Sequence, residues 1–336
     1  MRPRHPRPAP PRRPLLLRAA AAGALFGLLG ASGVQAQDYP NKPLRIIAPF
    51  PTGTGPDANT REIAAELSKV LGQPVVVENK PGASTMIGMA AGAGAAPDGY
   101  TLVMGSTTSM SVVPHLYAKV PYRHDKDFVP VSIVGLLNTA LIANAGVKEN
   151  SARELIARLK AQPEGLVAST SGVGSYSHLA GEWFAANAGV KIRFIPYATT
   201  SPYTDLIGGQ VQLMFDALPA AIGNVKAGKL KVLALTGKTR HPQFPEVPTF
   251  AEAGITQYSP TAWIGLFLPA GTPRAIVDRL GEAMQKATAQ NPALIEKWQS
   301  YGGELRAMSP DAFAAFLKED NALWGGAIGR AGIKLE

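Results

Sequence analysis

The sequence predicts an α/β protein with largely parallel sheets. Short apolar runs alternate with segments of helical periodicity along most of the chain, and this alternation is typical of layered α/β folds. The predicted strands are Leu44–Ala48, Val75–Val77, Thr101–Met104, Val131–Val134, Gly165–Ser169, Ile192–Ile195, Val211–Phe215, Val232–Leu235 and Trp263–Leu268. We therefore expect sheets flanked by helices, with functional loops at the strand ends.

Capping residues locate several helix boundaries. Ser151 and Glu154 have the spacing of a capping box. Three further helix starts are marked by a capping side chain that stands directly before a proline: Thr272, Asn291 and Ser309. Proline is harmless at the first helical position. Gly72 is predicted to end the helix that runs through residues 62–70.

Residues 1–36 have the layout of a secretory signal peptide. An arginine-bearing leader precedes an apolar stretch, Ala19–Leu29, and the small residues Val34-Gln35-Ala36 stand before Gln37. The apolar stretch is shorter than the roughly 20 residues that span a bilayer. We expect cleavage between Ala36 and Gln37 and a periplasmic location. The pair Arg12-Arg13 leaves both the general secretory route and the twin-arginine route open.

Charge and cysteine content exclude several classes of function. The formal charge of the whole chain is +9, and the leader carries six arginines and no acidic residue, so the mature chain is close to +3. No run of Lys and Arg remains that could follow a nucleic acid backbone. The chain contains no cysteine, which excludes disulfides, thiolate metal ligands and a lipidated cysteine anchor. We expect neither a cofactor nor a metal ion.

The segment from Pro49 to Asp57 joins a predicted strand to a predicted helix and contains Thr52, Gly53 and Thr54. Backbone N–H groups at such a turn can bind an anion, and threonine hydroxyls add donors. The alternative is an ordinary turn in which Asp57 caps the helix.

A second segment, Ser169 to His178, also follows a predicted strand. Ser175 is suited to cap the next helix, and two helix N-termini that face each other would suit a dicarboxylate. His178 could contact such a ligand, or it could have a structural role.

A third segment, Met214-Phe215-Asp216, ends a predicted strand where open α/β sheets place their ligands. The Asp216 carboxylate could fix hydroxyl groups or waters around a ligand, or it could accept hydrogen bonds from backbone amides of the next turn.

Other motifs give no support to an enzyme. Residues 223–229 fit part of a P-loop, but Leu230 stands where a Ser or Thr would bind magnesium, and Gly228 is better explained as a helix end. The four histidines of the mature chain lack the spacing of a zinc site. A Ser175–His178–Asp216 triad is conceivable, but the nucleophile motif G-x-S-x-G is absent.

Taken together, these segments resemble the Bug-type extracytoplasmic solute receptors, the substrate-binding proteins of tripartite tricarboxylate transporters. The resemblance runs from Tyr39 to Glu336. It rests on Tyr39-Pro40, Lys42-Pro43, Pro49-Phe50-Pro51 with Asp57, residues 72–83, residues 96–102, residues 171–182, Pro196-Tyr197, residues 208–211, residues 214–216, residues 227–230, residues 247–249 and residues 269–273.

The resemblance implies a two-lobed fold of the periplasmic-binding-protein type (type II), with a ligand cleft between the lobes. Each lobe would be a mostly parallel sheet flanked by helices. Lobe 1 would comprise residues 37–138 and 263–336, and lobe 2 residues 139–262. The family holds a carboxylate mainly through backbone amides, hydroxyls and waters. Carried over, the ligand-binding residues are Phe50, Thr52, Gly53, Thr54, Asp57, Ser84, Ser106, Thr107, Ser171, Gly174, Ser175, His178 and Asp216.

The implied function is capture of a small carboxylate, either a di- or tricarboxylate or an aromatic carboxylate, by a monomer that delivers it to the membrane permease of a tripartite tricarboxylate-type transporter. Thr52, Thr54, Pro56, Val173 and Ala217 depart from the family's usual loops, which bears on the identity of the ligand. The same fold would serve a protein that presents its ligand to a membrane sensor kinase. A more distant alternative is an exported hydrolase that uses Ser175.

Overall fold

A computed structural model describes residues 39–163, 165–197, 201–237, 239–256, 258–289, 291–300 and 302–332. The chain divides into two units, Met1–Asn41 and Lys42–Glu336, and the helices and strands below all belong to the second. The predicted signal peptide lies outside the described residues. Among the described residues, no helix is both long and apolar enough to cross a membrane.

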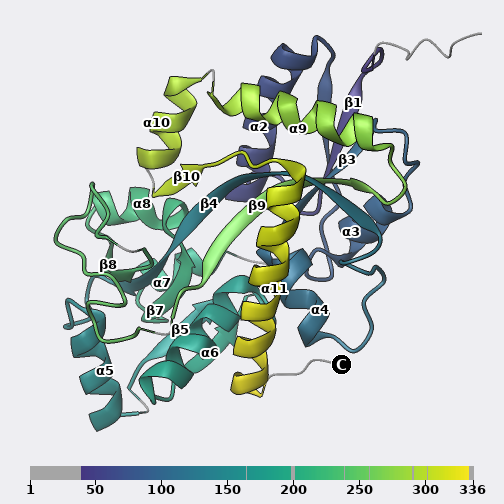
Figure 1. Ribbon diagram of the computed structural model, residues 1–336. Helices are drawn as coiled ribbons and strands as arrows, with labels where there is room; N and C mark the ends of the chain where they lie inside the picture. The colour runs from purple at the N-terminus through teal and green to yellow at the C-terminus, as the bar shows by residue number, and fades with distance from the viewer. Residues whose placement is uncertain are drawn as a thin grey trace, which may run out of the picture. The chain divides into compact units, whose positions relative to one another are not determined.

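The first sheet contains β1, β2, β3, β9, β10 and the first part of β4 (Figure 1). β1 pairs in parallel with β2 and with β3, as predicted, whereas β9 is antiparallel to β3 and to β4. Its strands are β1 (Leu44–Ala48), β2 (Val75–Asn79), β3 (Thr101–Ser106), β4 (Phe128–Asn144), β9 (Thr261–Pro269) and β10 (Gly303–Leu305).

The second sheet contains β5, β6, β7, β8 and the last part of β4. β5 is parallel to β6 and to β7, and β4 lies antiparallel to both β7 and β8. Its remaining strands are β5 (Val167–Thr170), β6 (Arg193–Pro196), β7 (Leu213–Ala217) and β8 (Leu230–Leu235). The expected α/β fold is confirmed, but both sheets are mixed rather than largely parallel: of the pairings between these strands, four are parallel and five are antiparallel.

β4 belongs to both sheets. Its residues from Phe128 to Asn138 pair with β9, and from Thr139 onward its residues pair with β7. The change of partner therefore falls between two adjacent residues, Asn138 and Thr139. The sequence predicted a strand of only four residues here, whereas β4 has 17 residues.

Helices cover both sheets and connect their strands. The helices are α2 (Gly55–Leu71), α3 (Met86–Ala93), the π-helix η1 (Thr108–Val112), α4 (Val113–Leu116), α5 (Ala152–Ala161), α6 (Tyr176–Ala188), α7 (Pro202–Ile207), α8 (Leu218–Lys226), α9 (Arg274–Ala289), α10 (Pro292–Ser300) and α11 (Pro310–Ala331). α11 passes in front of β9 between α4 and α6, and it contacts η1 and α4 as well as α6 (Figure 1).

Most of the predicted caps are confirmed. Ser151 and Ser309 accept hydrogen bonds from the third residue of their helices, and the Asn291 side chain accepts one from Leu294 N. Gly72 adopts φ 67° at the end of α2, a conformation that glycine enters without steric cost. The prediction for Thr272 is wrong in detail, because its hydroxyl donates to the Pro269 carbonyl at the end of β9.

The P-loop-like segment ends a helix. α8 closes at Ala227, and Gly228 follows at φ 71°. Gly228 N donates to Val225 O, and Lys229 N donates to Asn224 O. This pattern satisfies the last carbonyls of a helix, and it confirms the interpretation of Gly228 as a helix stop.

The cores are rich in buried aromatic side chains. Trp263 and Phe313 pack under the first sheet, and Trp183, Phe184 and Trp324 pack under the second. Each of these rings is at most 3% exposed. Burial of these large aromatic side chains supplies the hydrophobic stabilisation that a chain without disulfides needs.

Candidate ligand-binding site

The predicted site residues lie at the carboxyl ends of strands from both sheets. The end of β3 at Ser106 pairs with Ile264, which in turn pairs with Gly135 of β4, and the end of β7 at Ala217 pairs with Thr139 of β4. Gly135 and Thr139 are separated by about 13 Å at roughly 3.3 Å per residue. Both sheets thus direct their loop-bearing edges to the same short stretch of β4.

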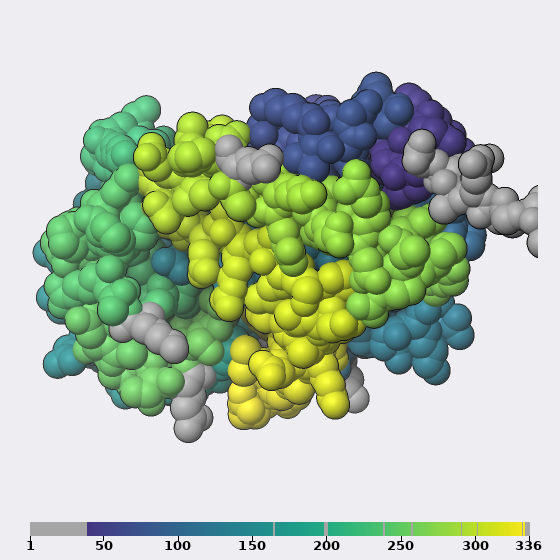
Figure 2. Space-filling view, turned by 45° about the horizontal axis from the view of Figure 1, so that its top comes forward, coloured from purple at the N-terminus to yellow at the C-terminus, as the bar shows by residue number. Residues whose placement is uncertain are grey.

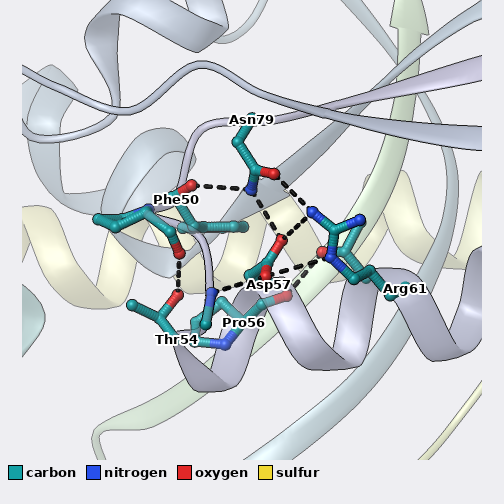
Figure 3. Close-up of polar contacts among 9 residues, drawn as sticks. Phe50, Thr54, Pro56, Asp57, Arg61 and Asn79 are labelled. Carbon is teal, nitrogen blue, oxygen red and sulfur yellow. Dashed lines mark hydrogen bonds and ion pairs between the residues drawn. The ribbon is translucent and has the colours of Figure 1, made fainter.

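The loop between β1 and α2 is built around Asp57, whose residue is only 2% exposed (Figure 3). Its carboxylate accepts hydrogen bonds from Gly53 N at 2.8 Å, from the Asn79 side chain at 2.7 Å and from Arg61 Nε at 3.2 Å. Burial acts to raise the pKa of Asp57, but these hydrogen bonds and the Arg61 charge outweigh it and hold the pKa below its usual value. The carboxylate therefore fixes the loop in place.

The same network reaches the next strand. Asn79, the last residue of β2, also donates to the Phe50 carbonyl at 3.0 Å, and the Thr54 hydroxyl donates to the Pro51 carbonyl at 2.8 Å. Thr52 and Gly53 are exposed, and Gly53 has φ 82° with no atom within 4 Å of the position a Cβ would occupy. The rim of the loop is open to a ligand while its base is held rigidly.

Ser84, Ser106 and Thr107 complete the edge of the first sheet. Ser84 lies in a turn of three non-glycine residues with positive φ, and its hydroxyl is 3.2 Å from the Tyr117 hydroxyl. Ser106 exchanges hydrogen bonds with Ser109 at the start of η1. Thr107 donates to Thr261 O and accepts from Trp263 N, so it joins β3 to β9.

The loop between β5 and α6 is also held by its own side chains. Ser175 Oγ accepts from His178 N at 3.3 Å and lies 3.0 Å from Ser177 Oγ, and Ser177 Oγ accepts from Ser171 N at 2.8 Å. Gly172 and Gly174 have positive φ. Ser175 is therefore the helix cap that the sequence predicted.

His178 has protein partners on both ring nitrogens. Its Nδ1 accepts from Gly174 N at 3.2 Å, and its Nε2 lies 3.6 Å from a Glu182 carboxylate oxygen. The Gly174 bond requires an unprotonated Nδ1. The contacts favour the structural role among the two interpretations of this histidine, and the Ser175 hydroxyl bonds to the His178 backbone N–H rather than to its ring.

Asp216 is the penultimate residue of β7 and lies next to two tyrosines. Its carboxylate accepts from the Tyr203 hydroxyl at 2.9 Å and from Ala217 N at 2.8 Å. Burial raises the pKa of Asp216 to about 6, although both hydrogen bonds act to lower it. Tyr176, the first residue of α6, contacts the Thr139 hydroxyl on β4. Tyr203 was missed by the sequence analysis because it lies on a separate helix.

The raised pKa gives Asp216 a distinct effect on stability. A carboxyl whose pKa rises from about 4 in the unfolded chain to about 6 in the folded one holds its proton more tightly when folded. Its contribution to stability is therefore lost as pH rises through this window. We expect Asp216→Asn to remove this pH-dependent loss of stability. The measurement is the unfolding free energy of wild type and Asp216→Asn at intervals from pH 4 to 7. Parallel curves for the two proteins would contradict the assignment.

These segments contain no cationic side chain. Residues 49–57, 82–85, 106–108, 171–178 and 216–218 include neither Lys nor Arg, and Arg61 is paired with Asp57. The N–H groups of Gly53, Ser171 and Gly174 already donate to side chains of their own loops. The donors left for a ligand are hydroxyls and the first N–H groups of α2 and α6. Such a set suits a small anion that approaches the backbone closely.

Comparison with known proteins agrees with this geometry. Residues 59–333 match the family described as tripartite tricarboxylate transporter family receptor. Protein BugT of Bordetella pertussis is 35% identical over 320 residues, covering 94% of this chain and 98% of BugT.

Two solved structures are similar along most of the chain. One is the R. palustris protein Rpa4515 with adipate, at TM-score 0.82 and 31% identity, covering 88% of this chain and 99% of that one. The other is MatC from Rhodopseudomonas palustris with bound malate, at TM-score 0.78 and 30% identity, covering 86% of this chain and 100% of that one. The fold is thus that of the two-lobed periplasmic binding proteins, and the chain belongs to the receptor family of the tripartite tricarboxylate transporters.

Proposed function

We propose that the mature chain is a monomeric periplasmic solute-binding protein that captures a small carboxylate and delivers it to the permease of a tripartite tricarboxylate transporter. The observation that carries the proposal is the set of strand-end loops from two sheets that converge on β4 without a lysine or arginine. The adipate and malate held by two relatives of the same fold support the ligand class.

In this proposal the ligand carboxylates bind to backbone N–H groups. The first N–H groups of α2 and α6 have no partner within their helices, and the helix dipoles favour negative charge there. Thr52, Gly53 and Thr54 would contact the ligand from the first sheet, and Ser171 and Gly174 from the second. Asp57 and Ser175 would act by holding these loops.

Capture would proceed by closure of the two predicted lobes, residues 37–138 with 263–336 and residues 139–262. The change of β4 partner between Asn138 and Thr139 supports this division. The proposal requires no catalytic step. Ser175 Oγ accepts from the His178 backbone N–H rather than bonding to its ring, while the His178 ring and Asp216 bond to Gly174 and Tyr203, so no observation favours the hydrolase.

The first test is thermal unfolding of residues 37–336 against aliphatic and aromatic carboxylates, including adipate and malate. A ligand present at a hundred times its dissociation constant is expected to stabilise the protein by about 2.7 kcal/mol. Recovery of the unchanged ligand afterwards establishes binding without turnover. Absence of a shift across the panel, or consumption of the ligand, would contradict the proposal.

Ser175→Ala is expected to separate ligand binding from helix capping. Ser309 of α11 caps its helix with the same 3.3 Å bond to the third helical N–H, so Ser309→Ala is a matched control. Both variants should lose about 1 kcal/mol of unfolding free energy. Only Ser175→Ala should weaken carboxylate binding, measured by titration calorimetry. Equal affinity in the two variants would remove Ser175 from the site.

A further inference from the structure

A second opening lies away from the predicted site residues. It has a volume of about 1120 Å³ and lies between residues 236–259, which follow β8, and residues 296–304 of α10 and β10. Leu136 and Asn138 of β4 also line it. Figure 2 shows a hollow between the green segments after β8 and the yellow-green surface of α10, with a blue, earlier part of the chain at its bottom. We call this opening the hinge pocket.

The hinge pocket and the α6 loop lie on opposite faces of β4. Asn138 lines the pocket, whereas the next residue, Thr139, contacts the Tyr176 hydroxyl at the start of α6. Successive side chains of a strand point to opposite faces of the sheet. None of the predicted ligand-binding residues lines the hinge pocket.

Both sheets contribute to the walls of the pocket. β10 belongs to the first sheet and α10 precedes it, whereas the lining residues between Thr236 and Ser259 follow β8 of the second sheet. At the inner wall the two sides touch, because a Cβ on Gly302 would lie 2.6 Å from Leu218 Cδ2 and 3.2 Å from His241 Nε2. Gly302 O also accepts from Asn138 N at 3.1 Å.

This geometry couples the two faces of β4, so that movement of the sheets on one face is accompanied by movement on the other. The close approach at Gly302 and the continuous strand β4 are where the two sheets would pivot, and the pocket lies outward from them. A rotation that brings the loops of the two sheets together on the Thr139 face of β4 must separate the walls on the Asn138 face.

The described residues of the pocket suit a different ligand from that of the first site. They include Glu296 and Glu304 and neither Lys nor Arg, so a carboxylate gains no cationic partner from them. The pocket is better matched to an uncharged or cationic molecule.

We infer that the hinge pocket is a control site for carboxylate binding: filling it drives closure of the lobes on the opposite face of β4. The inference rests on the proposed function for the identity of the ligand. A group that occupies the pocket stabilises the closed state, and stabilising the binding-competent state raises apparent affinity without a new ligand contact.

Gln299→Trp and Ala251→Trp test the inference by placing a large side chain in the pocket from each side. Both positions are exposed. The matched controls are Gln285→Trp on α9 and Ala161→Trp on α5, which are exposed elsewhere on the chain. We expect the pocket variants to bind adipate or malate about fivefold tighter or more, and the controls to be unchanged. Unchanged or weaker binding in both pocket variants would overturn the inference.

A ligand-free measurement separates this inference from the proposed function. The chain has no cysteine, so Thr52→Cys and Val173→Cys place one spin label on each loop of the predicted cleft. The mean label separation should be shorter with Gln299→Trp than with Gln285→Trp. Equal label separations in the two variants would refute the coupling between the hinge pocket and closure of the cleft. A shorter separation in a protein that binds no carboxylate would uphold this coupling and contradict only the proposed function.

Discussion

Replacing Asp57 by alanine is expected to abolish the fixed geometry of the loop between β1 and α2. The carboxylate satisfies donors from Gly53, Asn79 and Arg61 at once, and unpaired polar groups in a folded protein are costly. We expect the unfolding free energy to fall by about 2–3 kcal/mol and carboxylate affinity to fall at least about tenfold, equivalent to about 1.4 kcal/mol. Denaturant unfolding and titration calorimetry measure the two effects.

The pH dependence provides an internal check. The pKa of Asp57 is lowered in the folded state, so its contribution is present above the unfolded pKa of about 4 and is lost as pH falls through the folded value. The stability difference between wild type and Asp57→Ala should therefore shrink below about pH 4. Asp125→Ala, which removes an exposed carboxylate, should alter neither stability nor affinity appreciably. A constant difference at all pH values would contradict the role given to the Asp57 charge.

Trp324→Ala is expected to have the largest effect on stability. The Trp324 ring is 0% exposed and lies edge-on to Tyr176 and Trp183, with ring centres 5.7 Å and 5.5 Å away. Its removal leaves a cavity where α11 packs on α6, which costs about 3–5 kcal/mol in typical cores. Because Tyr176 begins α6, carboxylate affinity should fall as well.

Leu323 provides the control for that change. It is the preceding residue of α11 and is 39% exposed. Leu323→Ala should lower the unfolding free energy by less than about 1 kcal/mol and leave affinity unchanged. A similar loss in both variants, measured by denaturant unfolding, would mean that the tryptophan pocket adds little beyond helix propensity.

Strands with an apolar pattern could be predicted from the sequence, but pairing over long distances could not. β1 and β3 coincide closely with predicted runs, and β7 begins two residues later than predicted, because buried strands need continuous apolar residues. β4 extends from both ends of its predicted core because partners supplied by β9 and β7 stabilise residues with a weaker pattern. β10 has only three residues, Gly303–Leu305, and carries too little sequence to show any period.

The candidate site was predicted at the level of loops. Glycines and capping residues mark the turns at Gly53 and Ser175, because those positions need special backbone conformations or side-chain acceptors. The backbone-amide partner of Asp216 was among the predicted alternatives and is confirmed by the Ala217 N bond, but the side-chain partners of Asp57 and Asp216 were not predicted. Asn79 and Tyr203 reach these carboxylates through tertiary structure, and no local pattern encodes such contacts.

Because β4 pairs with strands of both sheets, the order in which the chain can fold is restricted. β3 is among the earliest strands, yet its partner β9 pairs Ile264 with Ser106 and follows the whole second sheet in the chain. Pairings between such distant segments form late, since their loop closure must be achieved before they stabilise anything. The first sheet therefore stays incomplete until the last quarter of the chain is available. A chain that lacks β9 and α11 should therefore leave β3 and β4 without their shared partner, and its fold should become stable only when these last elements are present.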